Sequence, residues 1–389
     1  MKNKLFSFFF LILLLSIASF SAGDQSRPSQ ERFLSIADIH FDPLAGCQHA
    51  KKPCPLALKL MNASASDWQQ ILEQDGASAV SGAFQETNYP LLKSTLMQLE
   101  KINQQQHPRF GLILGDFLEH DNRRQYILYS GDRTFLGYQL FVKKTLQFMT
   151  DQFHVYLPKL EIYPVIGNND SYSGDYRVVP DGKFLHDTAS TWAGYLIGSE
   201  NRASILRDFP TAGYYAVTVP GSSTDRILLL DTVLFSKNAK GKKMHAAADQ
   251  ELVWLDQQLK MASRNKQHVL LAFHIPSGID INLFLKHKFD IETDFWQTKY
   301  VDAVANIVKH YPSVVTGMLT AHVHVEFFQF IKIRPIGNVL ARFTPSISPI
   351  FGNNPAMKLF TITPDWHIGD PETYFLRLDR GVDLGWQQE

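Results

Sequence analysis

The sequence predicts an α/β fold in which helices cover mixed β-sheets, and two observations support this prediction. Short apolar runs of strand length alternate with longer segments whose apolar residues recur every three to four positions, as on one face of a helix. Five clusters of Asp, Asn and His follow the apolar runs directly. In such folds polar ligand-binding groups gather beyond the carboxyl ends of the strands, so the clusters mark one candidate site.

The first half of the chain contains three predicted strands and two predicted helices. The strands are expected at 32–39, 110–114 and 161–166, and the helices at 89–106 and 133–153. In the first helix Leu92, Leu96 and Leu99 share one face. The Ala-, Ser- and Gln-rich region from the end of the first strand to about Gln85 is predicted to be a long surface excursion.

The second half repeats this alternation and adds strands at its end. Strands are expected at 226–231, 268–273 and 314–319, and helices at 249–263 and 296–310. Three closing strands, expected to be antiparallel, are 338–343, 358–363 and 373–378. The chain has no internal repeat and no strong linker, so we predict one domain at 32–363 followed by a small appendage at 364–389.

The N-terminal 22 residues have the layout of a secretory signal peptide. Lys2 and Lys4 precede an apolar run from Leu5 to Phe20, and small residues follow. An uncleaved membrane anchor is the alternative, but the run is shorter than the roughly 20 apolar residues that a spanning helix needs. We therefore expect residues 1–22 to be removed and the mature chain to be exported, secreted or periplasmic, without a membrane span.

Cysteine content agrees with export, because the two cysteines are close together in the sequence. Cys47 and Cys54 lie in a Pro-containing loop after the first strand, and in an oxidising compartment the simplest interpretation is one local disulfide. A two-cysteine metal site is the weaker alternative. The short loop limits the stabilisation to about 2–3 kcal/mol.

The charge composition gives no sign of a polyanionic partner. The 389 residues are 45% hydrophobic and 20% charged, and 38 basic side chains balance 38 acidic ones. A net charge of zero gives no indication of a nucleic-acid polymer or an acidic membrane surface as a partner. The basic pairs Arg123-Arg124 and Lys242-Lys243 are most simply solvated loop charges.

The five clusters have the residue types of a site for two metal ions. They are Asp38-Ile39-His40, Gly115-Asp116, Gly167-Asn168, His274 and His322-Val323-His324. Carboxylate, amide and imidazole groups together suit Zn, Mn or Fe. In an extended backbone the Asp-x-His and His-x-His pairs each point to one side and could reach the same site. Each cluster alone is of a kind that is common in turns. All five in this order, each after a predicted strand, are not expected by chance.

The order of these clusters resembles that of the calcineurin-like metallophosphoesterase superfamily. Four segments narrow the resemblance to the acid sphingomyelinase-like branch, which includes endopolyphosphatase-like members: DIHFDPL from Asp38, GDFLEHD from Gly115, HIPSG from His274 and TPSISPIFGNNPAMKLF from Thr344. The resemblance covers about 32–362. It implies a four-layer fold, with mixed sheets between layers of helices, and a metallophosphoesterase catalytic domain.

The resemblance also implies a ligand set and a chemistry. One metal would be held by Asp38, His40, Asp116 and His324, and the other by Asp116, Asn168, His274 and His322. A hydroxide shared by the two divalent ions would attack a phosphodiester or phosphoanhydride of a small-molecule, nucleotide-like or polyphosphate substrate. The alternatives are a sphingomyelin phosphodiesterase and a binding protein that keeps the fold without turnover.

Two residues bear on the leaving group. Asn169 stands where the superfamily usually has a histidine that protonates the leaving group, and His120, four residues after Asp116, is the alternative acid. A phosphate leaving group needs this help less than an alkoxide does, so Asn169 favours phosphoanhydrides or activated diesters. His120 as a surface loop residue is the competing interpretation. Asp170 is expected either to orient Asn168 or His120 or to cap a helix, and Asn354-Pro355 has no predicted role.

Overall fold

The computed structural model describes residues 31–280, 294–333, 337–378 and 385–389. The expected signal peptide, 1–22, lies outside the described residues. Within the described ranges, no helix combines the length and the apolar character that crossing a bilayer requires.

The first of two sheets has the strand order β12-β11-β10-β1-β2-β3. Its strands are β1 (Glu31–Ile36), β2 (Gly111–Leu114), β3 (Ile162–Val165), β10 (Ala356–Ile362), β11 (Ile368–Leu376) and β12 (Trp386–Gln388). The strands β1, β2 and β3 are parallel to one another, and β10 runs antiparallel to β1. The segment expected to be an appendage thus contributes β11 and β12 to this sheet.

The second sheet has the order β4-β5-β6-β7-β9-β8. Its strands are β4 (Tyr215–Thr218), β5 (Asp225–Leu230), β6 (His268–Phe273), β7 (Val315–Thr320), β8 (Phe327–Ile333) and β9 (Gly337–Phe343). The core strands β5, β6, β7 and β9 are parallel. The expectation that 338–343 is antiparallel is therefore wrong with respect to β7, although β9 does pair antiparallel with β8.

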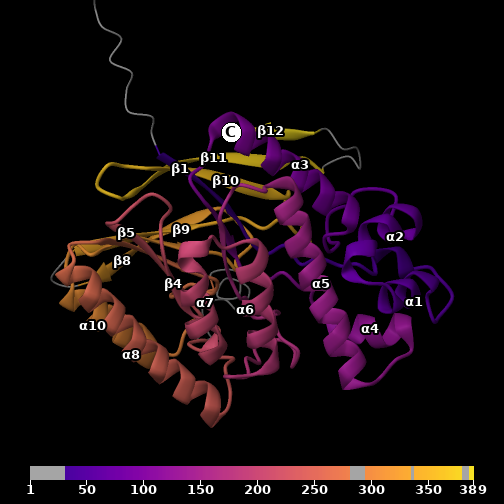
Figure 1. Cartoon of the computed structure of the whole chain (residues 1–389), viewed down its shortest axis with the longest axis horizontal. Helices are drawn as coiled ribbons and strands as arrows, with labels where there is room; N and C mark the ends of the chain where they lie inside the picture. Colours follow the sequence, from indigo (N-terminus) through magenta and orange to yellow (C-terminus); the bar gives the residue numbers. More distant parts are fainter. Residues whose placement is uncertain (1–30, 281–293, 334–336, 379–384) are drawn as a thin grey trace, which may run out of the picture. The chain divides into compact units, whose positions relative to one another are not determined.

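The two sheets face each other, and helices cover their outer faces (Figure 1). A Cβ atom on Gly317 of β7 would lie 2.9 Å from Ile368 of β11, so strands of the two sheets touch here. The helices are α1 (Pro55–Asn62), α2 (Trp68–Asp75), α3 (Tyr89–Gln106), α4 (Asn122–Ser130), α5 (Phe135–Tyr156), α6 (Lys183–Tyr195), α7 (Ser199–Ala212), α8 (Lys242–Arg264) and α10 (Thr298–His310). Mixed sheets between helices confirm the predicted four-layer α/β fold.

The helices pack through the apolar faces that the sequence predicts. Leu99 of α3 and Phe153 of α5 lie against Leu112 of β2, and all three are buried. On the second sheet, Leu255 and Leu259 of α8 are completely buried. The carboxyl ends of β1, β2, β3, β6 and β7 all lead into the loops that carry the polar clusters.

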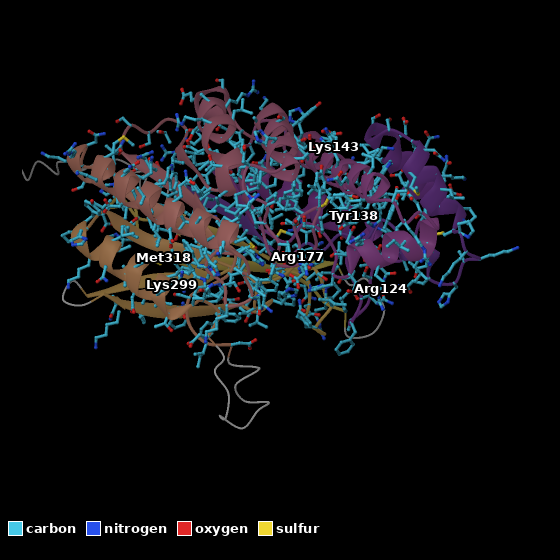
Figure 2. The ribbon with its side chains drawn as sticks, turned by 90° about the horizontal axis from the view of Figure 1, so that it is seen from below. Arg124, Tyr138, Lys143, Arg177, Lys299 and Met318 are labelled. Carbon is cyan, nitrogen blue, oxygen red and sulfur yellow. A yellow bond between two sulfur atoms is a disulfide. The ribbon has the colours of Figure 1, made fainter. Side chains whose placement is uncertain are left out.

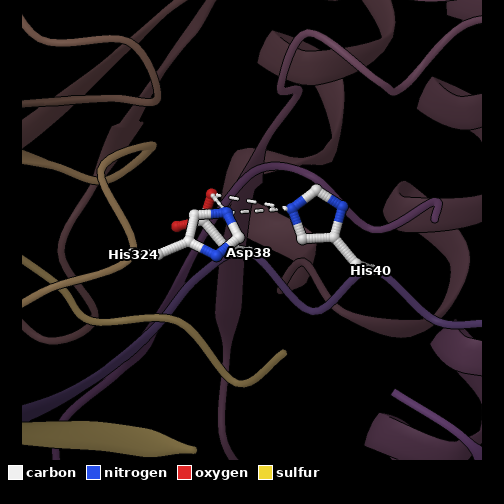
Figure 3. Close-up of side chains that lie close together, drawn as sticks. All are labelled: Asp38, His40 and His324. Carbon is white, nitrogen blue, oxygen red and sulfur yellow. Dashed lines mark hydrogen bonds and ion pairs between the residues drawn. The ribbon is translucent and has the colours of Figure 1, made fainter. Parts of the chain in front are cut away.

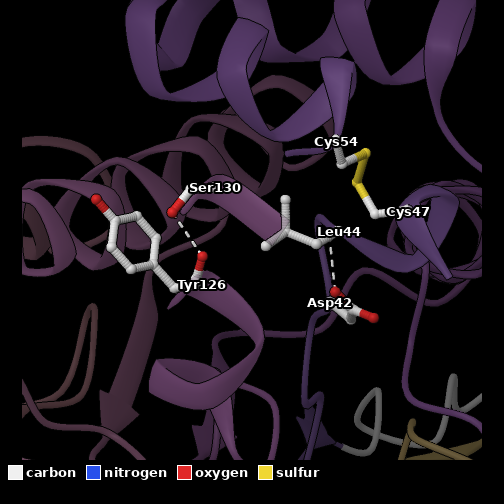
Figure 4. Close-up of a disulfide and its surroundings, with 6 residues drawn as sticks. All are labelled: Asp42, Leu44, Cys47, Cys54, Tyr126 and Ser130. Atoms are coloured by element: carbon white, nitrogen blue, oxygen red, sulfur yellow. Dashed lines mark hydrogen bonds between the residues drawn. A yellow bond between two sulfur atoms is a disulfide. The ribbon is translucent and has the colours of Figure 1, made fainter. Parts of the chain in front are cut away.

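The region predicted to be a surface excursion instead contains α1 and α2. Leu60 and Trp68 are completely buried there, because the apolar residues of these short helices pack against the rest of the core. The predicted disulfide is confirmed: Cys47 is bonded to Cys54, which directly precedes α1 (Figure 4). The backbone N–H of Cys54 donates to Tyr129 O at 2.7 Å, so the cross-linked loop is also fixed to α4.

Candidate metal centre

Asp38 and His40 follow the end of β1 in a backbone that is not extended. The strand ends at Ile36, and both residues have positive φ, 48° and 45°. The prediction that extended i, i+2 geometry aligns them is therefore wrong. Their N–H groups donate to Gly115 O at 3.0 Å and Asp116 O at 2.9 Å, and these bonds to the neighbouring loop hold the strained conformation.

Asp116 and Asn168 follow β2 and β3, which lie side by side. Gly167 permits their close approach, because a Cβ atom there would lie 2.1 Å from Oδ1 of Asp116. Asp116 is 2% exposed, yet it has a positive φ of 53°. A glycine and a strained aspartate at adjoining strand ends thus bring the carboxylate into the centre of the candidate site.

The three predicted histidine ligands come from the second sheet. His274 follows β6, and His322 and His324 follow β7, where both have positive φ, 74° and 61°. The N–H of His322 donates to Oδ2 of Asp38 at 3.1 Å, which joins the loops of the two sheets. The extended backbone predicted for the His-x-His pair is also wrong, and the two imidazoles enter different groups.

Six of the seven predicted ligands make up two of the three groups of side chains that could hold a metal ion in the described chain, the third being His40, Glu86 and His120. The first of the two contains Asp38, His40 and His324, and the second Asp116, His274 and His322. In the first group, Nε2 of His324 lies 3.4 Å from Oδ1 of Asp38 and 3.2 Å from Nε2 of His40 (Figure 3). In the second, Nε2 of His274 lies 3.3 Å from both Oδ2 of Asp116 and Nδ1 of His322.

Asp116 and Asn168 complete the arrangement. Oδ2 of Asp116, within the second group, is also 3.5 Å from Nε2 of His40 in the first group. Oδ1 of Asn168 lies 3.1 Å from Nε2 of His274. The seven residues predicted as ligands are thus brought together, with one carboxylate between the two groups.

Backbone carbonyls orient two of the imidazoles. Nδ1 of His40 lies 3.0 Å from Leu118 O, and Nδ1 of His274 lies 2.7 Å from Leu114 O. Because a carbonyl only accepts, each Nδ1 carries a proton, and each Nε2 points into the site. Metal-binding histidines are commonly held in this way.

The electrostatics of the buried centre keep most ligands in the form that binds cations. Burial, reinforced by neighbouring histidines, lowers the pKa of His40 to about 4 and that of His322 to about 3, so both imidazoles are neutral. Burial opposes ionisation of Asp116, but His274 and His40 hold its pKa well below the ordinary value. Burial also opposes protonation of His274, yet Asp116 and Asp38 raise its pKa to about 9. His40, His322 and Asp116 are thus in the form that binds a cation, whereas His274 has to release a proton to do so.

Asn169 and Asp170 support the ligands. The backbone N–H and the side-chain amide of Asn169 donate to the two carboxylate oxygens of Asp116 at 2.8 and 2.9 Å. Asp170 accepts from the N–H groups of Phe117, Leu118 and Gly167. Asp170 therefore ties the two ligand loops together, and neither of its predicted roles, orienting Asn168 or His120 and capping a helix, corresponds to these contacts.

His120 lies beside the metal groups and is held by a residue that sequence reasoning missed. Its ring stacks on His40 with centroids 4.1 Å apart, and its Nδ1 lies 2.7 Å from Oε1 of Glu86. Ser348 donates to the other oxygen of Glu86 at 3.0 Å. The Glu86 carboxylate accepts a hydrogen bond from Nδ1–H of His120, which leaves Nε2 as the ring nitrogen available to a substrate.

Other supporting residues also escaped the sequence analysis. Asp175 accepts from the amide of Asn168 at 2.8 Å, and the hydroxyl of Tyr176 lies 3.4 Å from Nε2 of His322. Ser346 and Ser348, from the TPSISPIFGNNP segment, both donate to Asp38 O. These two serines lie in a segment that carried the family resemblance. Asp175 and Tyr176 lie in a loop without a recognisable pattern, so no sign of them was visible in the sequence.

Comparison with known proteins supports the motif-based resemblance. No protein-family model matches the chain. Cyclic GMP-AMP phosphodiesterase SMPDL3A of Rattus norvegicus is 27% identical over 232 residues, which are 57% of this chain and 49% of that protein. Acid sphingomyelinase-like phosphodiesterase 3b of Homo sapiens is 24% identical over 383 residues, 94% of this chain and 75% of the relative.

The chain is similar in sequence to acid sphingomyelinase-like phosphodiesterases. This confirms the resemblance predicted from the motifs. The chain spans about half the length of the curated relatives that it matches first. A dimetal phosphatase from Danio rerio has a TM-score of 0.49 and 12% identity, with 92% of this chain and 98% of that one covered.

Proposed function

We propose that the protein is an exported, metal-dependent phosphoesterase that hydrolyses phosphodiester or phosphoanhydride bonds in nucleotide- or polyphosphate-like substrates. The observation that carries the proposal is the carboxylate of Asp116, which lies between two groups of buried imidazole and carboxylate ligands. The names of the curated relatives, which are phosphodiesterases, support the same reaction class.

The donor set fits two divalent cations. Oδ1 of Asp38 is buried and has no hydrogen-bond partner in the described chain, whereas nearly all such groups in proteins are paired. The Nε2 atoms of His40 and His324, only 3.2 Å apart, both face one point. A buried cation would satisfy these atoms, and their mixed nitrogen and oxygen chemistry suits Zn, Mn or Fe.

Each ligand has a defined place in the proposed site. Asp38, His40, Asp116 and His324 would hold one ion, and Asp116, Asn168, His274 and His322 the other. The ions would supply Lewis acidity and an activated water. Asn169 holds the shared carboxylate in place through two hydrogen bonds, and Asp170 fixes the loops that carry Asp116 and Asn168.

The residue proposed to protonate the leaving group is His120. Glu86 fixes its Nδ1, so Nε2 is free to hold a proton against the leaving oxygen. Asn169 has no acidic proton and its amide already donates to Asp116, so it cannot take this role. His120 is 38% exposed at its side chain, which is compatible with access for a substrate.

Export is part of the proposal. The N-terminal signal-like segment and the disulfide between Cys47 and Cys54 both favour an oxidising compartment. Retention of the signal-like segment on a protein recovered from the medium or periplasm would argue against cleavage.

A substrate panel tests the proposed reaction. The purified chain with Mn²⁺ or Zn²⁺ is assayed against bis-p-nitrophenyl phosphate, nucleoside triphosphates, polyphosphate and sphingomyelin. We expect metal-dependent release from the diester or the anhydrides. Absence of metal-dependent release from every compound would overturn the enzyme assignment, and release from sphingomyelin alone would replace it with the lipid-hydrolase alternative.

A further inference from the structure

A cleft lined by basic side chains borders the candidate metal centre. It has a volume of about 720 Å³ and lies between the segments 173–180 and 238–244. Its cationic side chains are Arg177, Lys240, Lys242 and Lys243. We call these four residues and the space between them the basic cleft. Arg177 is labelled in Figure 2, where it lies in that view between Arg124 and Lys299.

The wall of the basic cleft is attached directly to the metal centre. The N–H of Tyr176 donates to Asn168 O at 2.9 Å, and the hydroxyl of Ser171 donates to Arg177 O at 2.6 Å. The hydroxyl of the same Tyr176, which lines the cleft, is 3.4 Å from Nε2 of His322. A substrate whose reacting phosphate lies at the metals therefore has the basic cleft as its neighbour.

The charge of the basic cleft is unusual for this chain. The whole sequence has a net charge of zero, yet four cations line this cleft together with one carboxylate, Asp175. That carboxylate already accepts a hydrogen bond from the amide of Asn168. Besides burial, two further acids in the described ranges, Asp116 and Asp280, act on this wall by raising the pKa of Tyr176. None of the four cations forms an ion pair with a carboxylate in the described ranges, and all four are exposed.

The cations also correct a prediction. The Lys242-Lys243 pair was expected to be solvated loop charge, whereas these lysines begin α8, whose predicted start was 249, and lie at the cleft. Exposed lysines without partners are stable in water, so their charges alone say little. These lysines and Arg177 line the same cavity beside the metal-binding residues, and this arrangement indicates that the cavity binds an anion.

We propose that the basic cleft binds a second anionic group of the substrate, of the phosphate class, while the reacting phosphate lies at the metals. This inference rests on the proposed function. The metal centre binds only the reacting phosphate, so the basic cleft would distinguish substrates that carry a second anionic group from those that do not. A phosphoanhydride has such a group next to its reacting phosphate, and a simple diester such as bis-p-nitrophenyl phosphate does not. Cations at fixed positions around an anion give charge-assisted contacts.

The test compares two inorganic probes with the full-length chain and its variants. Dissociation constants of tripolyphosphate and orthophosphate are measured by calorimetry at a fixed free Mn²⁺ concentration. The variant is Arg177→Gln/Lys242→Gln/Lys243→Gln. The matched control is Lys101→Gln/Lys260→Gln/Lys309→Gln, which removes three exposed lysines of α3, α8 and α10 away from the cleft. Hydrolysis of bis-p-nitrophenyl phosphate is followed in parallel.

We expect the variant to bind tripolyphosphate about tenfold or more weakly, because three charge-assisted contacts to the second anionic group are lost. Orthophosphate binding and diester hydrolysis should stay within twofold of the wild-type values, as should every value of the control. Unchanged tripolyphosphate binding would overturn the proposal, and so would an equal loss for both probes. If no compound is hydrolysed but the variant still loses tripolyphosphate selectively, the proposed function fails and the binding site stands.

Discussion

The side-chain amide of Asn169 donates to Oδ2 of Asp116 at 2.9 Å, while its backbone N–H donates to Oδ1 at 2.8 Å. Asn169 stands where the superfamily usually has a proton-donating histidine, and in this chain it supports the shared carboxylate instead. Two donors fix the orientation of that carboxylate, and loss of such support commonly weakens metal binding.

Replacement of Asn169 tests this support. In Asn169→Ala the backbone donor remains but the amide donor is lost, so we expect metal affinity to fall by about 10- to 100-fold. Asn169→Asp should cost more, because a second carboxylate would face Asp116. The measurement is the Mn²⁺ concentration that gives half-maximal hydrolysis of bis-p-nitrophenyl phosphate. Metal dependence identical to wild type in both variants would contradict the role.

His120 and Glu86 are tested through the leaving group. A general acid contributes typically 10²–10⁴-fold when the leaving group is basic, and little when it is p-nitrophenolate. His120→Ala should therefore lose about 100-fold more activity on a dialkyl phosphodiester than on bis-p-nitrophenyl phosphate. Glu86→Gln should show the same pattern with a smaller loss, since it weakens the contact at Nδ1 of His120. Equal losses on both substrates would indicate only a structural role.

A buried carboxyl pair, Glu251 of α8 and Asp231 directly after β5, gives a pH dependence of stability. Burial, with Asp231 as a neighbour, raises the pKa of Glu251 well above its ordinary value, and Oε2 of Glu251 has no partner in the described chain. The folded chain thus keeps a proton that the unfolded chain releases near pH 4, so this group lowers stability as the pH rises from there towards the folded pKa.

Glu251→Gln should therefore stabilise the protein. We expect the free energy of unfolding in urea to rise by about 1–3 kcal/mol at pH 7, with the difference from wild type vanishing near pH 4. Oε1 of the glutamine can still accept the N–H of Asp231. The control is Asp249→Asn, an exposed acid on the same helix, which should change little. Destabilisation by Glu251→Gln at pH 7 would refute the assignment.

The disulfide gives a prediction about stability. Cys47→Ser/Cys54→Ser should lower the free energy of unfolding by about 2–3 kcal/mol, because the cross-link closes only a short loop. Urea denaturation of the variant and of the reduced wild-type chain should give the same midpoint. A midpoint equal to that of the oxidised wild type would show that the cross-link does not stabilise the fold.

Much of the fold was predictable from apolar patterning. The helix at 89–106 and the strand at 268–273 have the predicted bounds, because each has an uninterrupted apolar face or run. The helices α1 and α2 were missed, since each has only 8 residues, too few to show a clear helical period, and the region around them is rich in Ala, Ser and Gln. The helices α6 and α7 and the strands β4 and β8 were also not anticipated.

The candidate site was predictable in its residue types but not in its geometry. Ligand-type residues at strand ends were visible in the sequence, and the structure brings the seven together. The positive φ of Asp38 and His322 was not visible, because contacts between distant loops impose it. Glu86 and Tyr176 also escaped notice, since nothing in their local sequence indicates which histidine they contact.

Two divalent ions at the Asp116 centre are proposed to perform phosphoester hydrolysis, and a metal titration with an activity readout tests this proposal. Protein stripped with EDTA is titrated with Mn²⁺ while bound metal and hydrolysis of bis-p-nitrophenyl phosphate are followed, beside an Asp116→Asn control. We predict no activity without metal, full activity once both ligand groups are occupied, and loss of metal binding and turnover in the control. Turnover by the metal-free protein, or full activity of Asp116→Asn, would contradict the claim.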